Sequence, residues 1–448
     1  MLAALAMSGG ATVSAQTTDK LHVLIETDLG GDADDQASLV RFLVYANEWD
    51  IEGIISDRPA EAMNTDGARD YKHRKFRDGL DMACAYLDAY GEVRDNLAKH
   101  RHGYPTLDQL RRRTMPGWNS TEKGVKLIIA AADRDDPRPI WYSNWGSNSG
   151  STSNLRRALD KVQAERSPEE YQKFASRFRI VSLDGNAQWP RQGHADDILL
   201  HVETGYPVVD QARWYHRFRP LTERAGGFNV DRDVRNNHGP LGALYTTPKE
   251  GDSWTFIYLI PTGLSDPLEP TWGGWAGRYG PRDDAHHGPN RYWANMTDTW
   301  VEPKNGQAST NRDNTARRWA VHLQNDFRAR MDWCVAKFED ANHPPELQIQ
   351  GDLSSKPHRV DAQAGSPYTL DSTGTSDPDG NNLSYRWYIY PEPGTYSGNA
   401  VIRGGSSPRA TIEVPQDAVG KTLHIVLEVT DDGRPPLTRY RRTVLNVR

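Results

Sequence analysis

The chain is poor in cysteine and has no long apolar segment. Its 448 residues include two cysteines, Cys84 and Cys334. The fold therefore cannot depend on disulfides, although these two could pair if the helices expected to carry them meet. No apolar run approaches the roughly 20 residues that a membrane-spanning helix needs, so we expect no membrane span.

Neither positive nor negative charge is in large excess. The net charge is −6, and lysine and arginine are scattered along the chain. A nucleic acid polymer is therefore not expected as a partner. The sequence also lacks Gly-x-Ser-x-Gly, His-Glu-x-x-His and a cysteine pair at metal spacing, which argues against a serine hydrolase or a zinc enzyme. The oligomeric state stays open.

The beginning of the chain resembles part of a secretory signal. Residues 1–16 are small and apolar, and Val13-Ser14-Ala15 is similar to a signal-peptidase site. We therefore expect residues 1–19 to be a partial signal peptide and the protein to be secreted or periplasmic.

Residues 20–343 alternate short apolar runs with helical patterns. The pattern predicts an α/β fold, a parallel sheet with helices on both faces. The predicted strands are residues 21–25, 51–56, 139–143, 179–183 and 256–260, and the clearest helical patterns are residues 36–45, 124–132, 154–163 and 324–338.

Residues 344–448 have a different pattern. Apolar and polar residues alternate over 383–389 and 423–429, with turn signals such as Asp377-Pro378-Asp379-Gly380-Asn381. Period-two alternation bounded by turns predicts a second domain, an antiparallel β-sandwich. The run from Asp377 to Trp387 resembles immunoglobulin-like modules of secreted carbohydrate-active proteins. Its aspartates are better explained as turn residues than as ligands.

An unusual acidic loop follows the first predicted strand. It reads Glu26-Thr27-Asp28-Leu29-Gly30-Gly31-Asp32-Ala33-Asp34-Asp35. Clustered carboxylates repel one another, and Ca²⁺ relieves that repulsion by taking six to eight oxygen ligands. The end of a strand in an α/β sheet is also where ligands bind. The alternative is a turn in which Asp34 or Asp35 caps the next helix.

This loop resembles the metal-binding signature of nucleoside hydrolases, Asp-x-Asp-x-Gly-x-Asp-Asp. The longer glycine segment is similar to a secreted branch often labelled cellulose-binding. Asn237-His238-Gly239-Pro240, Leu264-Ser265-Asp266-Pro267 and Trp272-Gly273-Gly274-Trp275 also fit that branch. The resemblance covers roughly residues 20–343 and implies a nucleoside-hydrolase-like sheet.

The resemblance also implies a Ca²⁺ site with particular ligands. They are Asp28, Asp34, Asp35, the Trp145 carbonyl and Asp266. Asp28 would also be the general base that takes a proton from a metal-bound water, and the substrate would be a furanose-like sugar with a cis-diol. Packing is the alternative for Trp145, and a helix cap is the alternative for Asp266.

Several residues depart from the family pattern or have open roles. Ser265 replaces a histidine that helps the leaving group in many members, so His238, or His286-His287, could be the acid. Asp184 and Asn186 could contact the sugar, although a turn explains them equally well.

The aromatic loop offers a further substrate contact. The rings of Trp272 and Trp275 could pack on the face of a sugar, or they could plug the edge of the domain. The sequence therefore leaves two functions open. One is a secreted Ca²⁺-dependent hydrolase of a small glycoside, on an N-glycosidic or furanosyl bond. The other is a non-catalytic protein that binds carbohydrate such as cellulose.

Overall fold

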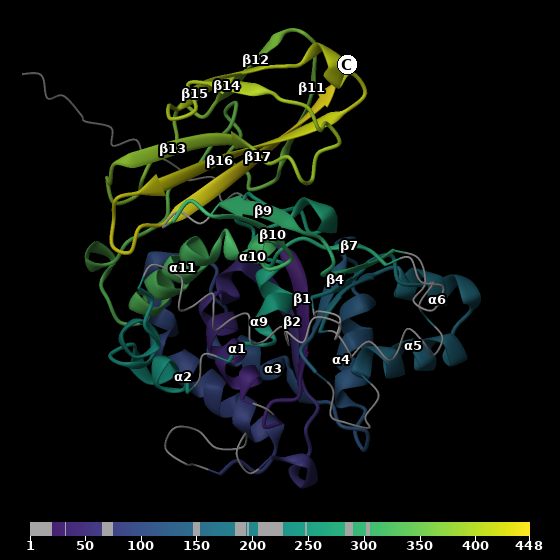
Figure 1. Cartoon of the computed structure of the whole chain (residues 1–448). Helices are drawn as coiled ribbons and strands as arrows, with labels where there is room; N and C mark the ends of the chain where they lie inside the picture. Colours follow the sequence, from purple (N-terminus) through teal and green to yellow (C-terminus); the bar gives the residue numbers. More distant parts are fainter. Residues whose placement is uncertain are drawn as a thin grey trace, which may run out of the picture.

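A computed structural model provides the fold of the chain (Figure 1). The structure describes residues 20–31, 33–64, 75–146, 153–183, 194, 197–204, 227–246, 249–282, 290–301 and 305–448. None of the helices in these ranges has the length and apolarity needed to cross a membrane.

The larger part of the molecule is built on a mostly parallel sheet, as the alternating pattern predicted. Its eight strands have the order β3-β2-β1-β4-β5-β6-β8-β7, and the β7–β8 pair is antiparallel. They are β1 (Leu21–Thr27), β2 (Trp49–Ser56), β3 (Thr114–Pro116), β4 (Ile140–Asn144), β5 (Phe178–Ser182), β6 (His201–Glu203), β7 (Gly280–Pro281) and β8 (Arg291–Trp293).

Helices cover both faces of this sheet, because its central strands are apolar on both sides. Side chains of α4, α5 and α6 form one core with Leu24 and Ile55, whereas those of α1, α2, α9 and α11 form the other with Val23 and Ile25. The bounds are α1 (Asp34–Val44), α2 (Gly79–His100), α3 (Leu107–Arg112), α4 (Lys123–Ala132), α5 (Asn154–Glu165), α6 (Pro168–Ala175), α8 (Gly239–Ala243), α9 (Ser253–Ile257), α10 (Asn314–Arg317) and α11 (Ala320–Asp332).

One predicted strand is wrong. Residues 256–260 were expected to be a strand, but the helix α9 (Ser253–Ile257) and a turn occupy this segment. All five residues are buried. A short apolar run that is buried on every side has no periodicity that separates a strand from a helical turn.

The C-terminal residues form two sheets packed face to face. Their orders are β11-β17-β16-β13 and β12-β15-β14, and each pair is antiparallel except β11 with β17. The strands are β11 (His358–Ala362), β12 (Pro367–Asp371), β13 (Leu383–Ile389), β14 (Val401–Arg403), β15 (Arg409–Glu413), β16 (Thr422–Asp431) and β17 (Thr438–Val447). This sandwich has its own apolar core, which includes Leu370, Ile412 and Ile425.

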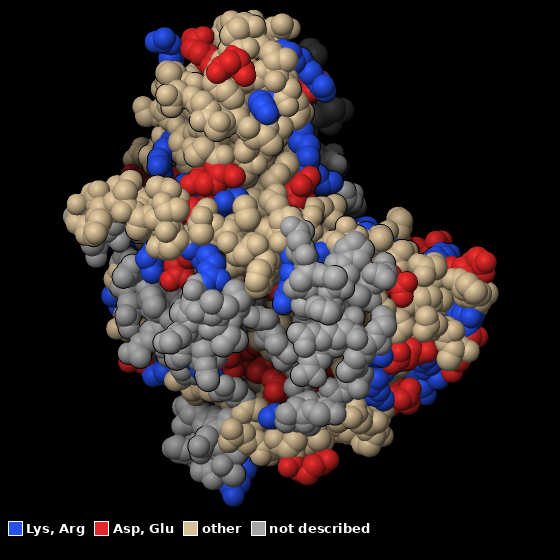
Figure 2. Space-filling view, turned by 45° about the vertical axis from the view of Figure 1, so that its right-hand side comes forward, with Lys and Arg blue, Asp and Glu red and all other residues tan. Residues whose placement is uncertain are grey.

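The sandwich sits on the larger part through an extensive junction (Figure 1). A hairpin, β9 (Asp298–Val301) and β10 (Ala308–Asn311), lies at this junction. Tyr390 and Tyr440 of the sandwich belong to the same apolar core as Trp275. Figure 2 shows acidic and basic side chains mixed over the visible face, with both signs close to the junction.

Candidate metal centre

The acidic loop leaves β1 through a tight turn and enters α1. The Gly31 amide donates to the Asp28 carbonyl at 2.9 Å. Gly30 has φ +96°, a left-handed conformation that glycine adopts without steric cost. The turn places Asp34 and Asp35 in the first turn of α1, where the positive end of the helix dipole favours carboxylates.

Three buried aspartates form the centre of the candidate site. Asp34, Asp35 and Asp252 each present a carboxylate oxygen, and these oxygens lie within 4.8 Å of one another. The three residues are 7%, 2% and 1% exposed. Asp28 lies close enough to these aspartates that its charge raises the pKa of both Asp35 and Asp252. The structure therefore brings together all three aspartates expected from the loop and adds a fourth.

The electrostatics of this cluster favour a bound cation. Burial raises the pKa of Asp35 and of Asp252 well above the ordinary value, and the neighbouring carboxylates raise both pKa values further. Buried carboxylates at this spacing need protons or a cation to offset their repulsion. Because every donor in the set is an oxygen, the residues present fit a hard divalent ion such as Ca²⁺.

The segment expected to supply a backbone ligand lies against this cluster. The Trp145 amide donates to the Glu26 carbonyl at 2.8 Å, which extends the β1–β4 pairing by one residue. A Cβ atom on Gly146 would lie 2.6 Å from the Asp28 Oδ1 atom. Glycine is therefore required where this backbone passes the carboxylate. The Trp145 side chain is buried and donates to the Ser143 Oγ atom at 2.9 Å.

Asp266, which the resemblance gave as a metal ligand, is not one of the three clustered aspartates. The Asp266 carboxylate pairs with Arg359 of the sandwich at 3.2 Å and accepts from the Leu268 amide at 3.0 Å. Asp252, at the N-terminal end of α9, completes the cluster instead. The difference has one cause. If residues 256–260 were a strand, a ligand would be expected after them, at Asp266. The segment is instead the helix α9, and Asp252 precedes it.

A buried ion pair holds the Asp252 segment against α1. The Arg41 side chain donates to both oxygens of Glu250, at 2.5 and 2.8 Å, and both residues are fully buried. Glu250 also accepts from the Ser253 hydroxyl at 2.7 Å. Since Glu250 and Ser253 flank Asp252, these contacts fix the loop that carries it. The sequence signal was Glu-Gly-Asp-Ser, a helix-capping pattern directly before an apolar run.

Glu26, which occupies the position of the first aspartate in the signature, has a different role. It is fully buried and accepts from the backbone amide and the side-chain amide of Asn154 at 3.1 Å each. Tyr142 also donates to it. Burial raises the pKa of Glu26 to about 7, although these hydrogen bonds oppose the shift. Glu26 therefore connects β1 to the start of α5 rather than joining the metal cluster.

Two cationic side chains flank the aspartates. The Arg58 Nη1 atom lies 3.5 Å from Asp28 Oδ2, and the Lys249 Nζ atom lies 4.0 Å from Asp34 Oδ1. Arg58 follows β2 by two residues. Its guanidinium also lies over the glycine turn, since a Cβ atom on Gly31 would be 2.6 Å from its central carbon.

His238, which the sequence offered as a catalytic acid, is held by α11. Its Nε2 atom lies 3.0 Å from Asp332 Oδ1, at the end of α11. Two residues earlier on α11, Arg330 donates to the Val44 carbonyl at 3.0 Å, at the end of α1 opposite Asp34. These contacts place His238 toward the C-terminal end of α1, whereas Asp34 begins that helix. Asp184, Asn186, His286 and His287 lie outside the described residues.

Trp272 and Trp275, which the sequence offered as substrate contacts, are both buried. The two residues are 7% and 2% exposed. Trp272 packs edge-to-face on His424, and the Trp275 Nε1 atom donates to the Tyr440 hydroxyl at 3.2 Å. Both rings therefore join the larger part to the sandwich, a role that neither alternative from the sequence included.

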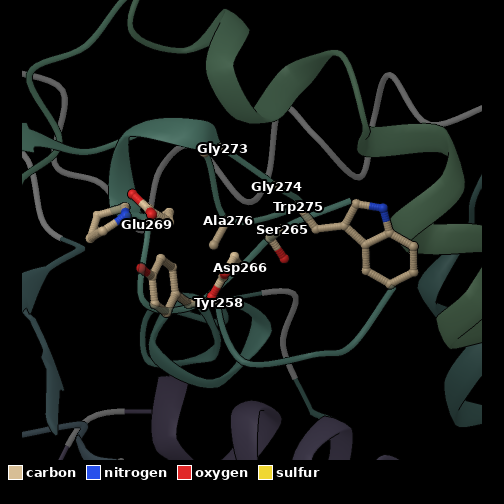
Figure 3. A pocket seen from close by; sticks show the side chains of 10 residues that line it. Tyr258, Ser265, Asp266, Glu269, Gly273, Gly274, Trp275 and Ala276 are labelled. Atoms are coloured by element: carbon tan, nitrogen blue, oxygen red, sulfur yellow. The ribbon is translucent and has the colours of Figure 1, made fainter. Parts of the chain in front are cut away.

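The cavity beside this aromatic loop is too small for a sugar. Its volume of about 10 Å³ is room for about one water molecule. Figure 3 shows Tyr258, Ser265 and Asp266 around it, with the Trp275 indole pointing away. Neither cysteine adds a reactive group, because Cys84 and Cys334 are free thiols whose pKa values are raised by burial.

Two family models match the chain. The model of the cellulose-binding Sde182 nucleoside hydrolase-like domain matches residues 22–279. The model of the cellulose-binding protein Sde0182 C-terminal domain matches residues 368–447. None of the curated proteins matches the chain.

A solved structure shows the same relationship over almost the whole chain. A nucleoside hydrolase-related hypothetical protein from Saccharophagus degradans, described as associated with carbohydrate metabolism, is 31% identical with a TM-score of 0.74. The alignment covers 96% of this chain and 100% of that protein. A PKD domain from the KIAA 1837 protein (16% identity, TM-score 0.18) covers 24% of this chain and 91% of its own. Human CDH23 EC21-23 (17%, TM-score 0.19) covers 25% and 35%.

Proposed function

The chain belongs to the family of Sde182-like cellulose-binding proteins with a nucleoside hydrolase-like domain, and from this premise we propose that it is a secreted, Ca²⁺-dependent glycoside hydrolase. The bond to be cleaved is an N-glycosidic or small furanosyl bond. The observation that carries the proposal is the cluster of Asp34, Asp35 and Asp252, with Asp28 beside it.

The four aspartates have different roles in this proposal. The buried Asp34, Asp35 and Asp252, together with Asp28, would hold the ion. When bound, Ca²⁺ supplies a water of lowered pKa and a two-point attachment for a vicinal diol. Asp28 has the more accessible carboxylate, with a side chain that is 20% exposed. It is therefore placed to take a proton from a water molecule as the general base.

Charge stabilisation is the second contribution of these residues. Departure of the leaving group leaves positive charge on the sugar, which nearby carboxylates stabilise. Arg58 offsets part of the Asp28 charge at 3.5 Å, so it tunes how readily Asp28 accepts a proton.

A pair of aspartate variants tests the proposal. Asp252→Asn removes a member of the cluster, whereas Asp266→Asn changes an aspartate that pairs with Arg359 instead. We expect calorimetric titration to show Ca²⁺ binding weakened more than about tenfold, or about 1.4 kcal/mol, in Asp252→Asn alone. Turnover of a panel of nucleosides and aryl furanosides should fall in the same variant. Equal behaviour of the two variants in both assays would exclude the metal-dependent mechanism.

A non-catalytic carbohydrate-binding protein is the second candidate. The match of residues 368–447 to the C-terminal domain of a cellulose-binding protein favours it, as does the contact of His238 with Asp332 on α11. Retention of the full chain on insoluble cellulose, with no hydrolysis of any glycoside by the Ca²⁺-loaded protein, would support this candidate instead. The full chain is needed because Tyr390 and Tyr440 share a core with the larger part.

The organisation of the chain completes the proposal. We place a secretory signal segment at residues 1–19, the hydrolase-like domain at 20–343 and the immunoglobulin-like sandwich at 344–448. The two family matches lie within these last two ranges. Detection of the processed protein outside the cell would test secretion.

A further inference from the structure

Two buried histidines meet at the junction between the hydrolase-like domain and the sandwich. His100 is the last residue of α2, and its Nδ1 atom lies 2.9 Å from the Nε2 atom of His343, in the segment that leads into the sandwich. The outer nitrogens also have partners. His100 Nε2 lies 3.0 Å from the Ala336 carbonyl, and His343 Nδ1 lies 2.8 Å from Asp379 Oδ1.

The Ala336 carbonyl, His100, His343 and Asp379 form one hydrogen-bonded relay. Its two outer partners determine how many protons the two histidines must hold. The Ala336 carbonyl can only accept, so His100 Nε2 must carry a proton. The Asp379 carboxylate accepts from His343 Nδ1 in the same way. Two neutral imidazoles then have no proton left for the contact between them, and two lone pairs would face each other at 2.9 Å. All three hydrogen bonds form together only when the relay holds one proton more than two neutral histidines and a carboxylate.

We propose that this relay is a pH-sensitive latch, in which one shared proton ties α2 of the hydrolase-like domain to the sandwich. The relay is neutral overall when it is closed, since the extra proton offsets the charge of Asp379. Asp379 belongs to the turn before β13, so the latch connects the two domains through their side chains. The His343 amide strengthens the connection, because it donates to Asp379 Oδ2 at 2.6 Å.

The surroundings of the histidines are apolar, with few other charges. The Trp333 ring stacks on His100 with centroids 5.6 Å apart, and the Phe338 ring stacks on His343 at 4.0 Å. The charged groups that act on His100 are Lys99 on its own helix and Asp379 across the junction, in addition to His343. Burial lowers the pKa of His100, so the apolar surroundings oppose a second proton on that ring.

The direction of the pH effect follows from the proton count. The closed latch needs the shared proton, which a histidine with a pKa of roughly 6.5 in the open or unfolded chain carries only below that pH. Latch stability is therefore fully present below that pKa and is lost as the pH rises above it. Within this window, loss of one proton on opening makes the opening equilibrium about tenfold more favourable per pH unit.

Three variants of the full chain test the latch. His100→Gln removes the shared proton, and Asp379→Asn keeps a hydrogen-bond acceptor but removes the charge. His102→Gln is the control, because it changes an exposed histidine two residues away. Denaturant unfolding between pH 5.5 and pH 9 measures the pH slope of each. We expect wild type and His102→Gln to lose stability above neutral pH, and His100→Gln to lack this component.

Asp379→Asn separates the latch from simple packing. Without the carboxylate the closed relay carries a net positive charge, so its proton should leave at a lower pH and the loss of stability should begin earlier. Nitrogen NMR of ¹⁵N-labelled histidine should show one doubly protonated ring in wild type at pH 6, and its signal should be absent in His100→Gln. Parallel stability curves for all four proteins, or two neutral rings at pH 6, would overturn the proposal.

Discussion

At the scale of single residues, Asp35 is the clearest case of a group suited to ligand binding rather than to stability. Its pKa in the fold is raised by burial and by Asp28 and Asp34. A raised pKa means that the folded state holds a proton that the unfolded state has already released. The metal-free protein should therefore lose stability as the pH rises from the unfolded pKa of about 3.9 through the raised value.

We expect Asp35→Asn to remove this penalty. The metal-free variant should gain about 1 kcal/mol of unfolding free energy at pH 7, and its stability should no longer increase when Ca²⁺ is added. Denaturant unfolding with and without Ca²⁺ measures both effects. A metal-free Asp35→Asn protein that is less stable than wild type at pH 7 would show that Asp35 has a structural role.

Gly146→Ala tests the backbone that passes Asp28. The new Cβ atom would lie 2.6 Å from Asp28 Oδ1, closer than real Cβ contacts come, so the carboxylate must move. We expect Ca²⁺ binding to weaken about tenfold, or about 1.4 kcal/mol, in calorimetric titration. Gly405→Ala in the sandwich is the control, because the nearest atom there is 3.3 Å away. Unchanged Ca²⁺ affinity in Gly146→Ala would place the ion away from Asp28.

Sequence reasoning found the residues of the site that are adjacent in the chain. Asp28, Asp34 and Asp35 stand in one loop whose composition already indicates a cation site. Asp252 comes from more than two hundred residues further along, and nothing local distinguishes it from an ordinary helix cap. The tertiary fold alone shows that this cap faces the loop.

At the scale of elements, the Arg41–Glu250 pair explains how α1 and α9 bring their aspartates together. Glu250→Gln leaves a buried guanidinium without its counter-charge, which costs about 3–5 kcal/mol of stability. We expect the same variant to weaken Ca²⁺ binding, because Glu250 anchors the loop of Asp252. Thermal unfolding and calorimetric titration measure the two effects separately.

A second buried ion pair, Arg278 with Asp298, provides the control for Glu250→Gln. Asp298 is fully buried and accepts from Arg278 at 2.7 Å, and it contacts Tyr390 of the sandwich rather than the acidic loop. Asp298→Asn should cost comparable stability and leave the Ca²⁺ affinity unchanged. If both variants bind Ca²⁺ equally well, the Arg41–Glu250 pair serves stability alone.

Element prediction was secure for periodic segments and uncertain for short apolar runs. Residues 154–163 lie within α5, because their apolar positions repeat at helical spacing. The apolar runs 21–25 and 51–56 lie within β1 and β2, whereas the similar run 256–260 does not form a strand. The α11 helix is shifted from the predicted 324–338 to Ala320–Asp332. Its mixed polar and apolar faces both contact protein, which blurs the ends of the pattern.

At the scale of the whole molecule, the two domains share one buried core. Arg442 of β17 is fully buried and donates to the carbonyls of Leu264 and Trp272 at 2.6 and 2.9 Å. The Tyr440 amide also donates to the Thr262 carbonyl at 3.2 Å. Composition alone could not assign Trp272 and Trp275 to this junction, because a tryptophan that binds sugar and one that joins two domains look the same in a sequence.

Because the core is shared, we expect stabilisation by bound Ca²⁺ to extend beyond the metal site. Ca²⁺ at 100 times its dissociation constant adds about 2.7 kcal/mol to the stability of whatever unfolds together with the site. Since Arg442 and Tyr440 tie β17 to the hydrolase-like domain, we expect Ca²⁺ to slow hydrogen exchange of amides in β16 and β17 as well as in α1. Protection confined to α1 and β1 would mean that the sandwich opens independently. Arg442→Met should produce that pattern, because it leaves the carbonyls of Leu264 and Trp272 without their donor and so uncouples the sandwich from the metal site.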